Sequence, residues 1–328
     1  MQPTAKKAHK NFHVVEASDP REMGQKLGSK FGSWTQRSIE EQCSQDSWLE
    51  KRSEVRRLLP LIEKWAGDLA EEIDSYSQAA QVDLIDAWVL STESEFDKDQ
   101  AEKCTTILSN DGQLLAHNED WSADASDSIC VLKRKIGEFS VFEFHYYAVP
   151  LGGTAFSVNS FGLCSAVNSL PVSTVSHGLP RNVVARLISH SCDAEAALAI
   201  IRDVPRYSGY NYVLSDTHGT CLNIECSADD FIVTEPSFPY VHTNHYRHLS
   251  GMPAVYASDS SYERLERVAA EASENMTKHR ASAILHDCYP VFSNKTIGSV
   301  VVDIETWSAL VWLKREKELG WLSYPLPT

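Results

Sequence analysis

The chain has 328 residues, of which 43% are hydrophobic and 23% are charged. This composition excludes disordered, collagen-like and coiled-coil proteins, because the apolar fraction is large enough for a packed core. Thirty basic against 45 acidic side chains give a formal net charge of −15, which repels nucleic acids and anionic membrane surfaces, so neither is an expected partner.

The first part of the sequence, residues 11–96, has mainly helical patterns. Asp19, Pro20 and Glu22 form the start signal of a helix, with an N-cap, a proline in the first turn and an early acid. A second helix is predicted from residue 49 past residue 58, and Pro60 is expected to break or kink it. Apolar residues three or four apart predict a third helix over residues 61–79, and residues 82–90 form a further apolar stretch.

Short β-type runs replace the helical patterns after residue 102. Strands are predicted at residues 105–108, 114–117, 129–132, 139–144, 154–158 and 163–167, separated by turn signals. Two helices follow at 181–191 and 193–202, then strands at 211–214, 222–226 and 231–234, a helix at 262–274, and strands at 300–304 and 310–313. This order predicts an α+β fold with helices packed on an antiparallel core.

The sequence shows no sign of export or membrane insertion. The lysines before residue 13 are not followed by an apolar stretch, and no run approaches the roughly 18 apolar residues of a membrane span. The eight cysteines form no Cys-x-x-Cys pair and are diluted over a long chain. We therefore expect a cytoplasmic protein with reduced thiols.

Cys104 lies where the helical part ends and the first β-run begins. A cysteine at this place becomes a chain N-terminus if its thiol attacks the Lys103 carbonyl and water opens the resulting thioester. The product carries a nucleophile and a base on one residue, because a free α-amine has a pKa of about 7.7 to 8.0 and can accept the thiol proton. The alternative is a buried strand cysteine that packs as a small hydrophobic side chain, and position alone favours it.

Four segments of the sequence point to one family when taken in order. They are residues 19–24 (Asp-Pro-Arg-Glu-Met-Gly), residues 104–121 (Cys-Thr-Thr, later His-Asn-Glu-Asp-Trp), residues 158–163 (Val-Asn-Ser-Phe-Gly-Leu) and residues 241–245 (Val-His-Thr-Asn-His). Together they resemble the penicillin acyltransferase family of N-terminal-nucleophile hydrolases, which includes acyl-CoA:6-aminopenicillanate acyltransferases and β-alanyl-amine hydrolases. The resemblance implies a four-layer αββα sandwich, with two antiparallel sheets between helical layers.

The resemblance also implies self-cleavage between Lys103 and Cys104. Residues 1–103 would form a helical α piece and residues 104–328 a β-rich catalytic piece, and the two would stay together as an αβ heterodimer within one αββα domain. No metal or organic cofactor is expected, since nucleophile, base and oxyanion donor would all be protein groups. One departure is Lys103 itself, because family members carry glycine there, and glycine permits backbone angles that a Cβ disfavours.

Single residues match the family's site. Cys104 resembles the nucleophile, Asp120 the carboxylate that orients its α-amine, and Asn244 the side-chain donor of the oxyanion hole. Without the resemblance, a turn aspartate and a loop amide bonded to its own backbone explain the last two. Asn168 and Asn211, at the edges of β-runs, are second-line candidates for substrate binding.

Aromatic residues give a weaker indication of the substrate. Tyr146 is a candidate for substrate binding, and Trp121, Tyr147, Phe156 and Tyr210 are further candidates to line a pocket for an aromatic group, although core packing explains them equally well. The expected reaction is hydrolysis or acyl transfer at the amide bond of a small N-acyl or β-aminoacyl amine, through a thioester.

Two alternatives remain open. An uncleaved, non-catalytic homologue would bind a small acylated amine without cutting it, and Lys103 favours this reading. His242, His245 and His248 would form a transition-metal site if they lay on a helix. Pro239 instead indicates a strand end followed by a solvated loop, which is the preferred interpretation.

Overall fold

The computed structural model of the chain describes residues 8–96, 104–172, 175–252 and 259–328. Two sheets form its centre. The larger sheet has eight strands, in the order β1 (Phe12–Ala17), β4 (Ile129–Ile136), β5 (Phe139–Tyr146), β6 (Phe156–Asn159), β7 (Leu163–Ser169), β8 (Tyr210–Asp216), β9 (Cys221–Cys226) and β10 (Phe231–Thr234). The smaller sheet has six, in the order β11 (Tyr240–His242), β2 (Thr105–Ser109), β3 (Leu114–Asp120), β12 (Thr296–Asp303), β13 (Ser308–Leu313) and β14 (Leu322–Pro325). Of these neighbours, β1 and β4 are parallel.

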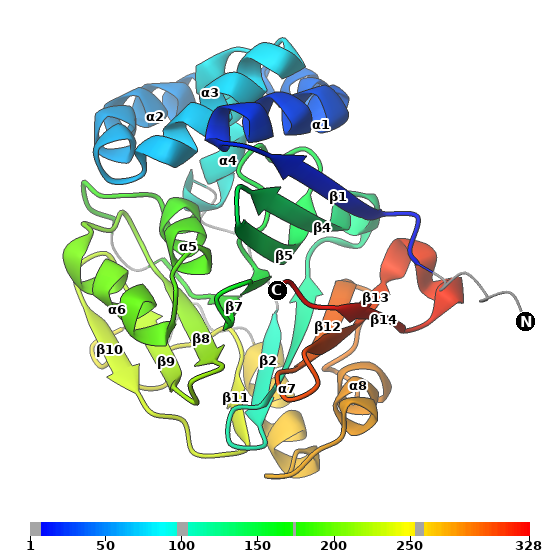
Figure 1. Cartoon of the computed structure of the whole chain (residues 1–328). Helices are drawn as coiled ribbons and strands as arrows, with labels where there is room; N and C mark the ends of the chain where they lie inside the picture. The colour runs from blue at the N-terminus through cyan, green and yellow to red at the C-terminus, as the bar shows by residue number, and fades with distance from the viewer. Residues whose placement is uncertain (1–7, 97–103, 173–174, 253–258) are drawn as a thin grey trace, which may run out of the picture.

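Helices cover the outer face of each sheet, which gives four layers (Figure 1). The larger sheet is covered by α1 (Pro20–Gln42), α2 (Asp46–Trp65), α3 (Gly67–Ala80), α4 (Leu84–Phe96), α5 (Arg181–Ser189) and α6 (Ala194–Asp203). The smaller sheet is covered by α7 (Asp259–Glu271) and α8 (Lys278–Asp287). Short 3-10 helices lie at Ala123–Asp127 and Lys314–Leu319. The predicted αββα sandwich is confirmed.

The interior between the sheets changes from apolar to polar toward Cys104. Leu108 of β2 and Leu115 of β3 face each other in the register and belong to the apolar cluster between the sheets. The register pair two residues closer to the start of β2 is Thr106 and His117, which point to the same side because strand side chains alternate. Polar groups are therefore buried at the end of the sandwich where the chain enters β2.

One predicted helix boundary is wrong. Pro60 lies inside α2, which continues to Trp65, and the break comes at Ala66, whose backbone leaves the helical region. Proline removes one backbone donor from a helix. The side chains of Leu58 and Ile62, on either side of Pro60, are fully buried in the apolar cluster between the helices and the larger sheet. Their packing holds the helix together across the missing hydrogen bond.

The structure contains several elements that the sequence did not predict. The segment before residue 18 was expected to be helical, yet it forms β1 and pairs with β4, so the N-terminal piece contributes a strand to the larger sheet. The short edge strand β14 and the helix α8 are further additions. The N-caps Asp19 of α1 and Asp193 of α6 are confirmed, because each side chain accepts a hydrogen bond from the backbone three residues on.

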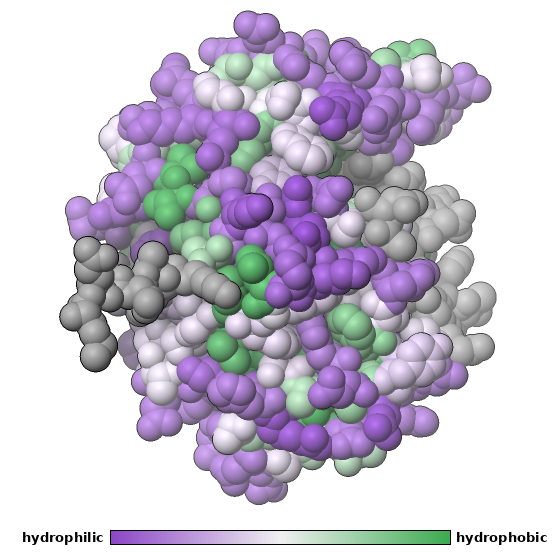
Figure 2. All heavy atoms as spheres, turned by 90° about the vertical axis from the view of Figure 1, so that its right-hand side faces the viewer, coloured by the Kyte–Doolittle hydropathy of each residue, from purple (hydrophilic) through white to green (hydrophobic). Residues whose placement is uncertain are grey.

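Figure 2 shows a face that is mostly hydrophilic, on which hydrophobic residues form small, separate patches. Within the ranges given above, none of the helices combines the length and the apolar character that crossing a lipid bilayer requires.

Candidate active site

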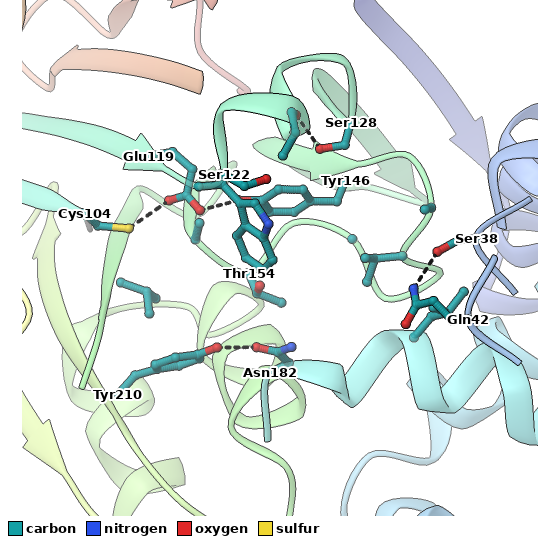
Figure 3. A pocket seen from close by; sticks show the side chains of 18 of the residues that line it. Ser38, Gln42, Cys104, Glu119, Ser122, Ser128, Tyr146, Thr154, Asn182 and Tyr210 are labelled. Atoms are coloured by element: carbon teal, nitrogen blue, oxygen red, sulfur yellow. Dashed lines mark hydrogen bonds between the residues drawn. The ribbon is translucent and has the colours of Figure 1, made fainter. Parts of the chain in front are cut away.

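Cys104 directly precedes β2, and only 2% of its surface is exposed. Its thiol donates a hydrogen bond to Oε2 of Glu119 on β3, at 3.3 Å. Figure 3 shows the two side chains pointing toward each other. The cysteine selected from the sequence therefore meets a carboxylate at the end of the sandwich where polar groups are buried.

Glu119 is the centre of a buried hydrogen-bond network. Its Oε1 accepts a hydrogen bond from the hydroxyl of Tyr146, and its Oε2 lies 3.1 Å from Nε2 of His117. Nδ1 of His117 lies 2.9 Å from Oγ1 of Thr106, which donates to Oδ1 of Asn168 at 2.9 Å. His117 and Glu119 share one face of β3 because residues two apart on a strand point the same way.

Arg264 on α7 approaches Cys104 from the outer side of the smaller sheet and hydrogen-bonds to it and to two residues near it. Its guanidinium donates to the carbonyl oxygen of Cys104 at 2.6 Å, to Oγ1 of Thr105 at 2.8 Å and to Oδ1 of Asn244 at 2.8 Å. Burial lowers the pKa of Arg264, whereas the charges of Asp120 and Cys104 act to raise it. The three predicted catalytic residues therefore surround one buried cation.

The amide of Asn244 is held at both ends. While its Oδ1 accepts from Arg264, its Nδ2 donates to the carbonyl oxygen of Ser169 at 3.0 Å. Its backbone N–H donates to Oγ of Ser261 at 2.8 Å. A side-chain amide fixed in this way presents its N–H groups in a defined direction, which is what an oxyanion donor requires.

Asp120 is the last residue of β3 and is also buried. Because neighbouring strand residues point to opposite faces, its carboxylate lies on the side of Arg264, and that of Glu119 lies on the side of the other sheet. Cys104 thus has one acid on each side of its strand. The role of Asp120 in orienting the α-amine stays a prediction.

A cavity of about 480 Å³ opens onto the thiol and the Glu119 carboxylate. The rings of Trp121, Tyr146 and Tyr210 lie in its wall, as predicted, and the first two are 5.6 Å apart between centroids. Tyr147 and Phe156 are not in the wall, so this part of the prediction is wrong. Both are packed in hydrophobic clusters, where rings gain more from burial than at a cavity surface.

Polar groups complete the wall of the cavity. The hydroxyl of Tyr210 donates to Oδ1 of Asn182 at 2.7 Å, and Ser38 and Gln42 reach the cavity from α1 (Figure 3). The cavity therefore lies between the N-terminal helices and the strands that follow Cys104.

Asn168 on β7 and Asn211 on β8 are direct neighbours in the register and are fully buried. Neither lines the cavity. Asn168 accepts a hydrogen bond from Thr106 and so belongs to the network that continues through His117 to Glu119. Direct substrate binding by the two asparagines stays a prediction, and the structure places them beneath the site.

The three histidines near residue 245 do not converge on a common point. Nε2 of His242 lies 3.1 Å from Oε1 of Glu225, and Nδ1 of His245 lies 2.8 Å from Oγ of Ser261. The backbone N–H of His248 donates to Glu225. The predicted strand end is confirmed, because β11 ends at His242, but the solvated loop is wrong, because His242 and His245 are buried.

Lys103, the predicted partner of Cys104 in the self-cleavage, lies outside the described residues. Glu119, His117 and Arg264 are the site residues that the sequence analysis missed. The first two carried a signal, since His-x-Glu within a β-run places two polar side chains on one face. Arg264 carried none, because 160 positions separate it from Cys104.

No curated protein sequence matches the chain. Among solved structures, a variant of conjugated bile acid hydrolase from Clostridium perfringens has 10% identity over 68% of this chain and 92% of its own, with a TM-score of 0.47. Penicillin V acylase from Agrobacterium tumefaciens has 13% identity over 64% and 83%, with a TM-score of 0.45. The model of the acyl-coenzyme A:6-aminopenicillanic acid acyl-transferase family matches residues 107–305, more than half of the chain, and the protein therefore belongs to that family.

Proposed function

We propose that the protein is a cysteine N-terminal-nucleophile amidohydrolase or acyltransferase that activates itself by cutting the bond before Cys104. The observation that supports this most directly is the position of the thiol. Cys104 immediately precedes β2, and its thiol is buried but lines the cavity. The carbonyl oxygen of the same residue accepts a hydrogen bond from Arg264. A purely structural strand cysteine requires none of these features.

Self-cleavage needs a base other than the α-amine, which does not exist in the uncut chain. The Glu119 carboxylate is placed for this task, because it already accepts the hydrogen bond of the thiol. The thiol proton passes to Glu119, Sγ attacks the Lys103 carbonyl, and the C–N bond to Cys104 breaks as its nitrogen takes that proton. Water then hydrolyses the thioester, which leaves a carboxylate on Lys103 and a thiol and amine on Cys104.

Turnover then uses the new chain end. The α-amine of Cys104 accepts the thiol proton, Sγ attacks the substrate amide, and the N–H of Asn244 stabilises the oxyanion, a contribution of about 3 kcal/mol in well-built sites. The amine of the substrate leaves with a proton from the α-ammonium. Water or a second amine resolves the thioester. Asp120, on the side of Arg264, orients the α-amine.

The cavity suggests the class of substrate. Its wall combines three aromatic rings with hydroxyl and amide groups, which suits a small N-acyl or β-aminoacyl amine that carries an aromatic part. After the cut, residues 1–103 remain bound to residues 104–328 as an αβ heterodimer, since β1 pairs with β4 and α1 to α4 pack on the larger sheet.

Denaturing mass spectrometry and N-terminal sequencing of the purified full chain test the proposal. We expect two pieces, residues 1–103 and 104–328, the second of which begins Cys-Thr-Thr. Cys104→Ala should give one uncut chain that releases no amine from penicillins, β-alanyl amines or simple N-acyl amines. Cys226→Ala, at another buried strand cysteine, is the matched control and should be cut like the wild type. A cut Cys104→Ala chain would reject self-processing.

A non-catalytic homologue is the second candidate, and Lys103 in place of glycine favours it. It predicts a wild-type chain that stays intact on prolonged incubation, together with a Cys104 thiol that does not react with alkylating reagents.

A further inference from the structure

Three side chains of the site form a group that suits a metal ion. Cys104, His117 and Glu119 each offer one ligand atom, and these atoms all lie within 4.8 Å of one another. All three residues are buried, with 2% or less of their surface exposed. In the part of the chain that the structure describes, this is the group in which three such ligands converge.

Two of the three separations between the ligand atoms are close to those around a tetrahedral ion. Zinc binds thiolate sulfur at about 2.3 Å, imidazole nitrogen at about 2.0 Å and carboxylate oxygen at about 2.1 Å, so the edges of its coordination tetrahedron measure roughly 3.3 to 3.6 Å. Sγ of Cys104 lies 3.3 Å from Oε2 of Glu119, and Nε2 of His117 lies 3.1 Å from the same oxygen. These two edges need adjustments of a few tenths of an ångström, and the third, between Sγ of Cys104 and Nε2 of His117, measures at most 4.8 Å.

One ring nitrogen of His117 faces the group and the other is held from behind. Nε2 lies 3.1 Å from Oε2 of Glu119. Nδ1 lies 2.9 Å from Oγ1 of Thr106, which fixes the orientation of the ring. Nε2 is therefore the ring nitrogen that a metal ion bound at Glu119 would meet.

Outer contacts hold the ligands as metal-binding side chains are commonly held. A histidine ligand is usually hydrogen-bonded through its second ring nitrogen, and Nδ1 of His117 lies 2.9 Å from Oγ1 of Thr106. The carboxylate of Glu119 is fixed through its other oxygen by Tyr146. The cavity reaches Cys104 and Glu119, which gives an ion a route of entry (Figure 3).

We propose that Cys104, His117 and Glu119 form an inhibitory binding site for Zn²⁺. A thiolate, an imidazole and a carboxylate are the donors that zinc prefers, whereas Mg²⁺ and Ca²⁺ require oxygen ligands. The thiol of Cys104 releases its proton to solvent when it binds the ion. The ion acts as an inhibitor, because it engages the sulfur that must attack the substrate, and in this respect the inference rests on the proposed function.

Cobalt substitution tests the site without reference to activity. Co²⁺ titrated into metal-free full-length protein should produce a near-ultraviolet thiolate-to-cobalt absorption band that saturates at one ion per chain, and Zn²⁺ should displace it. Cys104→Ala should lose the band. Glu119→Gln, which keeps the shape of the side chain, should weaken Co²⁺ binding by at least about tenfold, as loss of a supporting group at a metal site commonly does. Cys43→Ala, at an exposed thiol, is the control and should keep the band.

A band that persists in Cys104→Ala, or its absence in the wild type, would overturn the zinc site. The same protein assayed for amine release separates this result from the proposed function. Cobalt binding at Cys104 in a protein that releases no amine in its metal-free form contradicts the enzyme and leaves the metal site standing. If the protein releases amine at a rate that neither added Zn²⁺ lowers nor a chelator raises, the metal site is contradicted and the enzyme is not.

Discussion

The guanidinium of Arg264 donates a hydrogen bond to Oδ1 of Asn244 at 2.8 Å. This contact turns the Nδ2 end of the amide away from the guanidinium. Because Oδ1 is taken by Arg264, Nδ2 points toward the carbonyl oxygen of Ser169, at the end of β7. The N–H groups of Asn244 are therefore oriented before any substrate binds, and an oxyanion gains most from donors that need no reorientation.

Asn244→Ala should lower kcat by about 10²- to 10³-fold with little change in KM, because an oxyanion donor acts in the transition state rather than on the bound substrate. Asn244→Asp should be at least as slow, because it places a carboxylate where negative charge develops. Steady-state kinetics of amine release measure both. Asn275→Ala, at an exposed position, is the control. A KM that rises while kcat holds would instead assign Asn244 to substrate binding.

Glu119→Gln separates the two proton transfers of the proposed mechanism. Glutamine still accepts the hydrogen bond from Tyr146 but cannot take up the thiol proton, so self-cleavage should slow by about 10²-fold or more. The intact fraction, followed by mass spectrometry after expression, reports this rate. Glu138→Gln, in an exposed turn, should be cut at the wild-type rate. Equal cutting of the two variants would remove Glu119 from the processing step.

Some parts of the site follow from local sequence patterns, and other parts depend on contacts between distant segments. The first strand after Cys104 was predictable, because its β-type run ends at the turn signal Asn110-Asp111-Gly112. Asn244 was found only through the resemblance, since its orientation depends on Arg264, which approaches from another layer of the fold. Contacts between layers leave no mark in a local pattern, and Arg264 could not be predicted for that reason.

Local patterns also failed where packing overrides them. Pro60 is a helix breaker in isolation, but α2 passes through it because both neighbouring turns are buried. The segment of β1 is too short to show a clear alternation, and it is a strand because β4 offers a free edge beside it. In both places the partner, and not the segment itself, decides the structure.

The pH dependence of stability should carry a contribution from His286. This ring is surrounded by Phe292, Trp312 and Trp321, with centroids 4.4 to 4.7 Å away. Burial lowers its pKa to about 4, although Asp287 acts to raise it. The unfolded chain, with a pKa near the ordinary 6.5, takes up the proton first, so this stability is complete above about pH 6.5 and is lost as the pH falls toward 4.

Urea unfolding between pH 7.5 and 4.5 measures this contribution. His286→Gln should be less stable than the wild type at pH 7.5, because it loses ring packing, and the difference between the two proteins should narrow as the pH is lowered. Other histidines with lowered pKa values, such as His13, are present in both proteins and cancel in the difference. A constant difference across the range would show that the His286 ring titrates normally in the folded protein.

Two adjacent glutamates on α3 give a sharp test of what holds the cut pieces together. Oε1 of Glu72 lies 2.9 Å from Nη1 of Arg134 and 3.6 Å from Nη2 of Arg186. All three side chains are at most 3% exposed. Its neighbour Glu71 pairs with Arg21 on the surface, where 41% of the Glu71 side chain is exposed. Glu72 belongs to the N-terminal piece and both of its arginines to the catalytic piece, so this buried group spans the proposed cut.

Glu72→Ala leaves two buried cations short of one partner and should lower the free energy of unfolding by about 3 to 5 kcal/mol. Glu71→Ala removes an exposed ion pair and should cost less than about 1 kcal/mol. In the cut protein we expect the first variant to separate into its two pieces on dilution, as seen by size-exclusion chromatography, while the second elutes as one species. Equal behaviour of the two variants would mean that β1 and the apolar helix faces suffice to hold the pieces together, because these contacts are unchanged in both.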